Sequence, residues 1–310
     1  MPDVIKVENL SKSFRTVVAV DSLSFSVEEG TIHGFLGQNG AGKSTTIRML
    51  LTLIKPSSGN ISIFGKNLSF NRGEILKQTG AIIEKPDLYK YLTALENMQL
   101  MARLSGCTSG KNELMRQLAM VGLSERADSK VKTFSQGMKQ RLGIACAMVH
   151  QPKLIILDEP TNGLDPQGIA DVRNLILHLS KNEKKTILVS SHLLSEMELI
   201  ADAMLIIDKG KKIAEGKMSE LLNPADTLVE VRTCDDAGAL QKLSSSAWNT
   251  NIRKSENKIL LQLHKNEIPA LNRDLVQMGI DVLSLEPKHS LEDYFLSLTR
   301  PSQHVAAYKN

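Results

Sequence analysis

The sequence predicts an α/β protein with a parallel-sheet core, followed by a small second unit of mixed α and β structure. Two observations lead to this prediction. Short apolar segments alternate with helical patterns along the first two thirds of the chain, and strands separated by helices are typical of a parallel sheet. The composition then changes within residues 221–227, where Asn223 and Pro224 indicate a turn and a domain boundary.

Each strand of the core is expected where apolar residues either alternate with polar ones or form a short continuous run. Helical periodicity follows in residues 43–54 and again within residues 93–122. Strands are expected at residues 22–30, 31–37, 60–65, 81–83, 153–158, 186–192 and 203–210.

The second unit is expected to run strand, helix, strand, helix, strand over residues 228–232, 237–243, 258–263, 268–278 and 281–285. A last helix is expected near Ser290, because a serine three residues before an acid is a capping-box pattern. We therefore predict a first domain at residues 1–222, an accessory α+β domain at 226–302 and a tail at 303–310.

Composition and charge exclude several classes of protein. A hydrophobic content of 42% among 310 residues is ample for a buried core. The net charge of +4 comes from 38 basic and 34 acidic residues that are scattered along the chain, so no nucleic-acid surface is expected. Three widely spaced cysteines indicate free thiols in a cytosolic protein rather than disulfides or zinc ligands. No apolar run reaches the roughly 18–20 residues that span a bilayer, so a membrane role would need a partner.

A phosphate-binding loop is predicted between a strand and a helix. The segment GQNGAGKST fits the pattern G-x-x-x-x-G-K-[ST], in which glycines let backbone N–H groups surround phosphate oxygens. The helix N-terminus adds the positive end of its dipole. The lysine reaches the β- and γ-phosphates, and the following serine hydroxyl ligates Mg²⁺. The predicted nucleotide-binding residues are Gly37, Gln38, Asn39, Gly40, Ala41, Gly42, Lys43, Ser44 and Thr45.

Asp158 and Glu159 form an acid pair at the exit of an apolar strand. Adjacent carboxylates at such a position are costly unless a cation neutralises them, and Mg²⁺ does so. We expect Asp158 to hold the metal and Glu159 to polarise the attacking water as general base. Taken alone, the pair could equally cap the following turn, but the phosphate loop favours the catalytic interpretation.

At this point the chain resembles an ATP-binding cassette (ABC) ATPase. The segment FSQGMKQR resembles the family signature LSGGQ followed by x-Q-R, with Ser135 and Gly137 at matching positions and Gln136 and Met138 as departures. NGLD ends in Asp165, matching the D-loop aspartate, and VSSH ends in His192, matching the switch histidine.

The resemblance, which covers residues 1 to about 222, implies a fold and a set of roles. The fold is a P-loop NTPase core with a parallel sheet, an antiparallel β subdomain and a helical subdomain at about residues 88–150. Ser135 and Gly137 would engage the γ-phosphate bound to a second copy, so that a homodimer encloses two ATP molecules. His192 would bond the γ-phosphate or the water. Phe14 would stack on adenine, although a core phenylalanine is the alternative there.

Glu84 occupies the position where most family members carry a glutamine that touches Mg²⁺ and the attacking water. An ionised glutamate offers only acceptors and adds a charge that is favourable beside a metal ion. We therefore expect Glu84 to be a catalytic and metal-binding residue together with Ser44 and Asp158. The alternative is a surface acid beside Lys85.

The glutamate, DEPTNGLDP and the closing SLEDYFLSLT together resemble subunits that export bacitracin or lantibiotic peptides for resistance or self-protection. The resemblance implies ATP and Mg²⁺ as cofactors, a separately encoded transmembrane permease as partner, and a place on the cytoplasmic face of the membrane. The alternatives are an ABC ATPase for another substrate and a non-transport ABC ATPase acting on ribosomes or DNA. A single phosphate loop and the absence of a long heptad insertion disfavour the latter.

Overall fold

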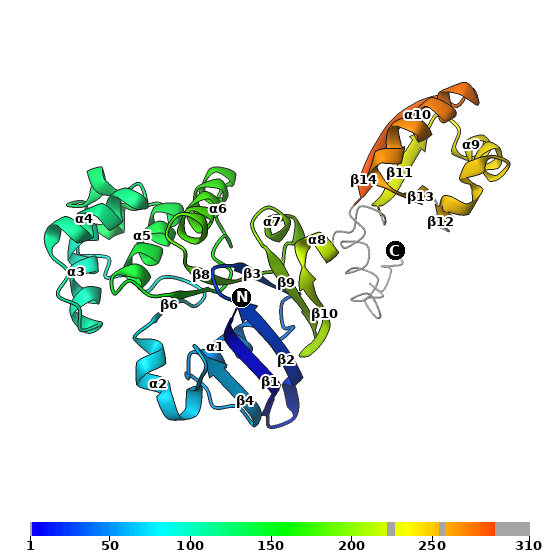
Figure 1. Ribbon diagram of the computed structural model, residues 1–310. Coiled ribbons are helices and arrows are strands. Elements are labelled where there is room, and N and C mark those ends of the chain that lie inside the picture. The colour runs from blue at the N-terminus through cyan, green and yellow to red at the C-terminus, as the bar shows by residue number, and fades with distance from the viewer. Residues whose placement is uncertain (1, 222–226, 254–257, 289–310) are drawn as a thin grey trace, which may run out of the picture. The chain divides into compact units, whose positions relative to one another are not determined.

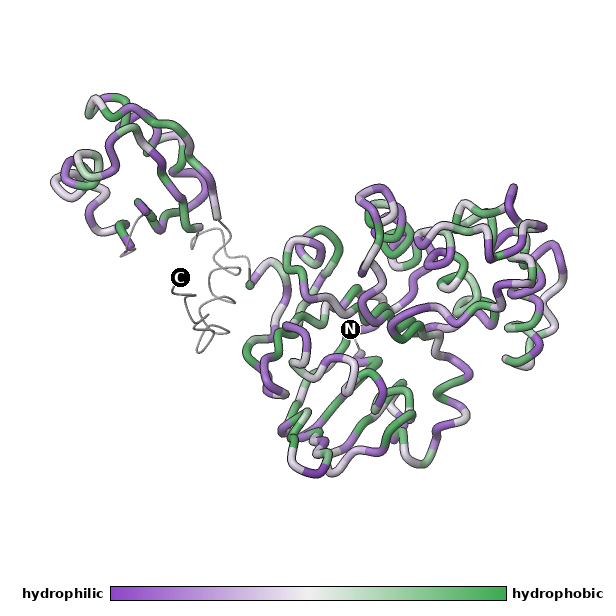
Figure 2. Tube along the Cα trace, turned by 180° about the vertical axis from the view of Figure 1, so that it is seen from behind, coloured by the Kyte–Doolittle hydropathy of each residue, from purple (hydrophilic) through white to green (hydrophobic). Residues whose placement is uncertain are grey.

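The computed structural model describes residues 2–221, 227–253 and 258–288, and the chain divides into two compact units, of which the first ends at Met218 and the second begins at Ser219 (Figure 1). Each unit has its own buried apolar cluster. In Figure 2 apolar and polar segments alternate along the helices, as expected when one face of each helix is buried.

The core of the first unit is a six-stranded sheet in the order β10-β9-β3-β8-β7-β6. Its strands pair in parallel except for β9 and β10, which form an antiparallel pair at one edge. Every residue of β3, β7 and β8 is buried, and β7 accordingly reads as the continuous apolar run LIIL. The strands are β3 Ile32–Leu36, β6 Thr79–Ile82, β7 Leu154–Leu157, β8 Thr186–Ser191, β9 Ala203–Asp208 and β10 Lys211–Lys217.

A second, antiparallel sheet has the order β2-β1-β4-β5. Alternate residues of β1 and β2 are buried, and they share one apolar cluster with Phe35 of β3 and with Ile47 and Leu50 of α1. The cluster therefore fixes the helix that follows the phosphate loop against both sheets. The strands are β1 Asp3–Phe14, β2 Val17–Glu28, β4 Ser58–Ile63 and β5 Lys66–Asn67.

In Figure 1, helices α3, α4 and α5 lie together beside the β6 end of the six-stranded sheet. α3 begins with a capping box in which the Thr93 hydroxyl accepts from the N–H of Glu96 and the Glu96 carboxylate accepts from the N–H of Thr93. The helices of the first unit are α1 Lys43–Leu50, α2 Leu68–Leu76, α3 Ala94–Leu104, α4 Lys111–Met120, α5 Gln136–Met148, α6 Pro166–Lys181 and α7 Leu194–Glu198. α8 Met218–Leu221 begins at the last residue of this unit.

The prediction of a helix over residues 43–54 was too long. α1 ends at Leu50, and Thr52 adopts a left-handed backbone conformation with φ 58°. That conformation cannot continue a right-handed helix. The strand predicted at 81–83 is β6, which begins earlier, at Thr79, and ends at Ile82.

In the described residues of the second unit, an antiparallel sheet in the order β12-β13-β11-β14 is accompanied by helices α9 and α10. The predicted alternation of strands and helices is confirmed, while the helix expected near Ser290 lies outside the described residues. Trp248 packs against the apolar cluster and donates from Nε1 to Asp274 Oδ2 at 2.9 Å. The elements are β11 Thr227–Thr233, α9 Asp236–Ser244, β12 Ile252–Arg253, β13 Ile259–Leu263, α10 Ile268–Gln277 and β14 Val282–Lys288.

Candidate nucleotide-binding site

The phosphate loop joins the end of β3 to the start of α1 and curls around its own lysine. Lys43 is 5% exposed, and its Nζ donates to the carbonyl oxygens of Gly37 at 2.6 Å and Gln38 at 3.3 Å. Gln38, Asn39 and Gly40 are exposed. The remaining predicted loop residues lie on the buried or half-buried side of the turn: Gly37, Ala41, Gly42, Lys43, Ser44 and Thr45.

Neighbouring strands hold the loop closely. Gly42 has a left-handed backbone with φ 106°, and a Cβ there would lie 2.6 Å from the carbonyl oxygen of Ala19 in β2. Gly210, in the turn after β9, donates from its N–H to the carbonyl oxygen of Ala41 at 2.9 Å. Glycine is thus required at position 42 both for its conformation and for the close approach of β2.

The acid pair lies directly after β7, beside β6 and β8. Asp158 is 1% exposed, and its Oδ1 accepts from Ser190 Oγ of β8 at 2.6 Å. The same Ser190 Oγ accepts from the backbone N–H of Glu159 at 2.9 Å. Asp158 Oδ2 is buried and has no hydrogen-bond partner in the part of the chain that the structure describes. A buried carboxylate oxygen in this state is well suited to a cation.

Glu159 connects the phosphate loop with the end of β8. Its Oε1 lies 3.1 Å from Lys43 Nζ, an ion pair rather than an aligned hydrogen bond, and its Oε2 lies 2.8 Å from His192 Nδ1. Its backbone is left-handed, with φ 50°, which is uncommon for a residue other than glycine. Backbone strain of this kind is concentrated at functional sites. The structure thus brings together Lys43, Asp158, Glu159 and His192.

Glu84 does not join this cluster. It follows β6, whose last residue, Ile82, accepts from the N–H of Asp158 at 2.9 Å, so its loop begins beside the acid pair. The Glu84 side chain is 64% exposed, and its Oε1 accepts from Arg48 Nη2 at 2.6 Å. Arg48 was not among the residues singled out from the sequence, because no spacing rule connects positions 36 residues apart.

Two further predicted residues are helix N-caps. The Ser135 hydroxyl accepts from the N–H of Met138 at 3.2 Å at the start of α5, and the Asp165 carboxylate accepts from the N–H of Gly168 at 3.2 Å at the start of α6. Gly137 is buried, and a Cβ there would lie 3.6 Å from the Cα of Gly168. Among the described residues no hydrogen bond or ion pair joins Ser135 or Gly137 to the Lys43 cluster.

Phe14 lies at the end of β1 and is 46% exposed, so it is not a core residue. Lys12 Nζ lies 4.9 Å from the centroid of the Phe14 ring, within the range of a cation–π interaction. Lys12 Nζ also donates to the carbonyl oxygen of Lys55 at 2.7 Å. The aromatic ring is therefore available at the surface for stacking.

Comparison with known proteins identifies the family. Residues 20–162 match the family described as ABC transporter. The bacitracin transport ATP-binding protein BcrA of Bacillus licheniformis is 43% identical over 300 residues, which are 96% of this chain and 98% of that protein. The chain belongs to the ABC transporter family.

Two other ABC proteins are similar to this chain over about the length of its first unit. The lantibiotic transport ATP-binding protein SrtF of Streptococcus pyogenes is 42% identical over 212 residues, covering 68% of this chain and 90% of that protein. A dimeric ATP-binding cassette in a post-hydrolysis state, bound to ADP and Pi, superimposes with a TM-score of 0.62 at 25% identity, covering 69% of this chain and 98% of that chain. This chain is accordingly an ABC transporter ATPase, which binds ATP and hydrolyses it to ADP and phosphate.

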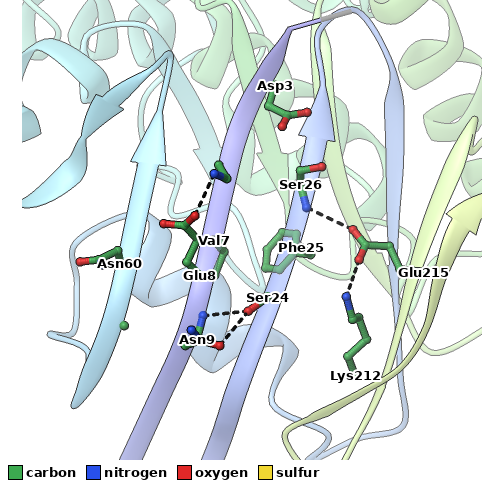
Figure 3. Close-up of a pocket in the computed structure, with 12 residues that line it drawn as sticks. Asp3, Val7, Glu8, Asn9, Ser24, Phe25, Ser26, Asn60, Lys212 and Glu215 are labelled. Carbon is green, nitrogen blue, oxygen red and sulfur yellow. Dashed lines mark hydrogen bonds and ion pairs between the residues drawn. The ribbon is translucent and has the colours of Figure 1, made fainter.

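A hollow of about 840 Å³ on the antiparallel sheet of this ABC subunit is separate from the phosphate loop (Figure 3). Its two lysines are ion-paired, Lys6 with Glu8 at 2.8 Å and Lys212 with Glu215 at 2.7 Å. Glu215 also accepts from the N–H of Ser26. With its lysines already neutralised by carboxylates, the hollow is not suited to a phosphate group.

None of the helices in the described ranges is long and apolar enough to cross a membrane. The same ranges contain no group of three or more histidine, cysteine or acidic residues that could hold a metal ion.

Proposed function

We propose that this chain is the ATP-hydrolysing subunit of an exporter that confers resistance to a peptide antibiotic of the bacitracin or lantibiotic type. Two relatives, BcrA and SrtF, are named as transport ATP-binding proteins for bacitracin and for a lantibiotic. The resemblance to BcrA extends over both units of the chain, not only over the part that binds nucleotide. A separately encoded transmembrane permease would form the path of the peptide and hold this subunit at the cytoplasmic face of the membrane.

The similarity to BcrA over 96% of the chain carries the export part of the proposal, and the meeting of Lys43, Glu159 and His192 at the phosphate loop carries the hydrolytic part. In this cluster Lys43 would exchange loop carbonyls and Glu159 for phosphate oxygens. Glu159 would then be free to accept a proton from water, with His192 Nδ1 holding the carboxylate in place. The carbonyl and carboxylate contacts of Lys43 keep a buried ammonium satisfied before nucleotide arrives.

The donor set also fits a magnesium ion. Mg²⁺ takes oxygen ligands and is usually held by one or two carboxylates together with substrate phosphates. Asp158 supplies a buried carboxylate oxygen without a partner in the described chain, and the neighbouring Ser44 is half-buried at the start of α1. When bound, the ion would neutralise the phosphate charge. Ser44, Asp158 and Glu84 are the residues that would hold it.

The remaining predicted residues would act on a bound nucleotide in two ways. Phe14 would stack on the adenine ring. Ser135 and Gly137 would engage the γ-phosphate of ATP bound to a second copy, with Asp165 at the interface between copies. Two features support this arrangement: these N-caps make no described contact with the Lys43 cluster of their own chain, and the related cassette bound to ADP and Pi is dimeric.

The test of the export proposal is antibiotic susceptibility. The chain is expressed together with its neighbouring membrane-protein genes in a sensitive Gram-positive host, and the minimal inhibitory concentrations of bacitracin and of a lantibiotic are measured. We expect the wild-type chain to raise at least one of them and Glu159→Gln to raise neither. A wild-type pair that hydrolyses ATP but protects against neither antibiotic would overturn the proposal.

A further inference from the structure

Arg48 and Glu84 connect the helix after the phosphate loop with the loop after β6. Arg48 Nη2 donates to Glu84 Oε1 at 2.6 Å. Arg48 lies in α1 four residues after Ser44, so the two side chains are on the same face of that helix, one turn apart. Glu84 follows the last residue of β6 by two positions. The pair thus lies one helical turn from the predicted metal ligand Ser44.

The backbone at Glu84 adopts an uncommon conformation. Its φ is 59°, in the left-handed region where residues other than glycine are uncommon. Such conformations persist only when surrounding contacts fix them, and they are concentrated at clamps and switches. Among the described residues, Arg48 is the partner of the Glu84 carboxylate.

The ion pair between Arg48 and Glu84 can be broken at little cost when a stronger partner for the Glu84 carboxylate is present. The Arg48 side chain is 42% exposed and the Glu84 side chain 64% exposed, and ion pairs between exposed groups contribute little to stability. A divalent cation with bound phosphates nearby is a stronger competitor for a carboxylate than one exposed guanidinium. The contact can therefore hold Glu84 before nucleotide binds without preventing its release afterwards.

We propose that Arg48 is a positioning residue that holds the Glu84 carboxylate in the nucleotide-free chain and gives it up to the metal–nucleotide site. The inference rests on the proposed role of Glu84 toward the metal. It implies that the metal competes with Arg48 for the Glu84 carboxylate. Arg48 therefore reduces the factor by which the metal strengthens nucleotide binding. It also ties the position of the loop after β6 to the helix that begins with Lys43.

The experiment measures how much a metal strengthens nucleotide binding. The dissociation constant of a fluorescent, non-hydrolysable ATP analogue is determined with and without saturating Mn²⁺, and the ratio of the two values is the coupling. Arg48→Gln, Glu84→Gln and the double variant are compared with the wild-type full-length chain. Arg48→Lys tests rescue by a retained charge, and Arg103→Gln in α3 is the control for loss of an exposed arginine.

We expect Arg48→Gln to raise the coupling roughly two- to fivefold, the size of an exposed ion pair, when Glu84 is present. In the Glu84→Gln chain the same substitution should change nothing, and Arg48→Lys and Arg103→Gln should match the wild type. An equal change in both backgrounds, no change, or a fall in coupling would overturn the role of Arg48. Failure of the wild-type chain to bind the analogue at all would instead contradict the proposed function.

Discussion

Lys43 Nζ lies 3.1 Å from Oε1 of Glu159, so the lysine of the phosphate loop and the proposed general base neutralise each other before nucleotide binds. Lys43 begins α1 and Glu159 follows the last residue of β7 by two positions, and their side chains are 5% and 16% exposed. A phosphate group that attracts Lys43 therefore also releases Glu159. In this arrangement, nucleotide binding itself frees the Glu159 carboxylate to act as a base.

Glu159→Gln should abolish most turnover while leaving ATP binding intact. The amide cannot accept a proton, and the loss of a general base costs about 10²–10⁴-fold in rate. Phosphate release measures turnover, and size-exclusion chromatography with ATP measures dimer formation. We expect the variant to accumulate as an ATP-bound dimer. Normal turnover would refute the assignment of Glu159 as base.

Ser190→Ala should destabilise the first unit and disturb the acid pair. The substitution removes the donor to buried Asp158 Oδ1 and the acceptor of the Glu159 N–H. Leaving a buried carboxylate without its hydrogen bond costs about 1–3 kcal/mol. Thermal melting checks this expectation, with exposed Ser105→Ala as the matched control. Equal melting temperatures for the two variants would contradict it.

Gly42→Ala should impair both folding and nucleotide binding. Any side chain at position 42 meets the Ala19 carbonyl oxygen at 2.6 Å, and the left-handed backbone alone costs roughly 1–2 kcal/mol. Gly73→Ala is the matched control, because Gly73 lies in helix α2 and a Cβ there would meet no atom within 4 Å. We expect Gly73→Ala to stabilise the chain slightly. If the Gly42→Ala protein binds ATP and melts as the wild type does, the phosphate loop tolerates a side chain at position 42 and the prediction is wrong.

His33 predicts a pH dependence of stability. Burial lowers the pKa of His33 from 6.5 to about 4, against the opposing effect of the Glu215 and Glu28 carboxylates. Between these two values the unfolded chain binds a proton that the folded chain does not, so stability falls as the pH falls from 6.5 toward 4. The loss attributable to His33 is at most about 3 kcal/mol.

His33→Leu should remove this contribution. Urea unfolding at several pH values between 4 and 7 is the measurement, and the slope of the free energy of unfolding against pH should be shallower in the variant. His178→Gln, at an exposed histidine, should keep the wild-type slope. Identical slopes for His33→Leu and the wild type would show that other groups account for the pH dependence.

The sequence predicted the phosphate loop, the acid pair and most core strands because each has a local pattern. Strand β7 is buried along its whole length and reads as a continuous apolar run, and the equally buried β8 contains the apolar run of residues 187–189. The expectations missed β1 and β10, whose lysines and glutamates lie on exposed faces and interrupt the apolar pattern. Of the two, only β10 is an edge strand, whereas β1 lies between β2 and β4, so an interrupted apolar pattern rather than an edge position explains why both were missed.

Side-chain partnerships across strands were beyond the reach of the sequence. Ser190 stands in an apolar strand and carries no sign that it contacts both Asp158 and the Glu159 backbone from 31–32 residues away. Arg48 likewise reads as a helix residue with an exposed charge until β6 brings Glu84 beside it. Such contacts depend on the register of neighbouring strands, which only the folded chain sets.

The bond from Gly210 to Ala41 and the close approach of β2 to Gly42 brace the phosphate loop from two directions. A nucleotide consequently meets a receptor whose shape is already set, and little conformational entropy is lost there when it docks. The free energy of the phosphate contacts is then available to drive rearrangements elsewhere in the subunit. In an ABC ATPase, a preformed phosphate loop thus leaves more of the binding free energy of ATP available for conformational change.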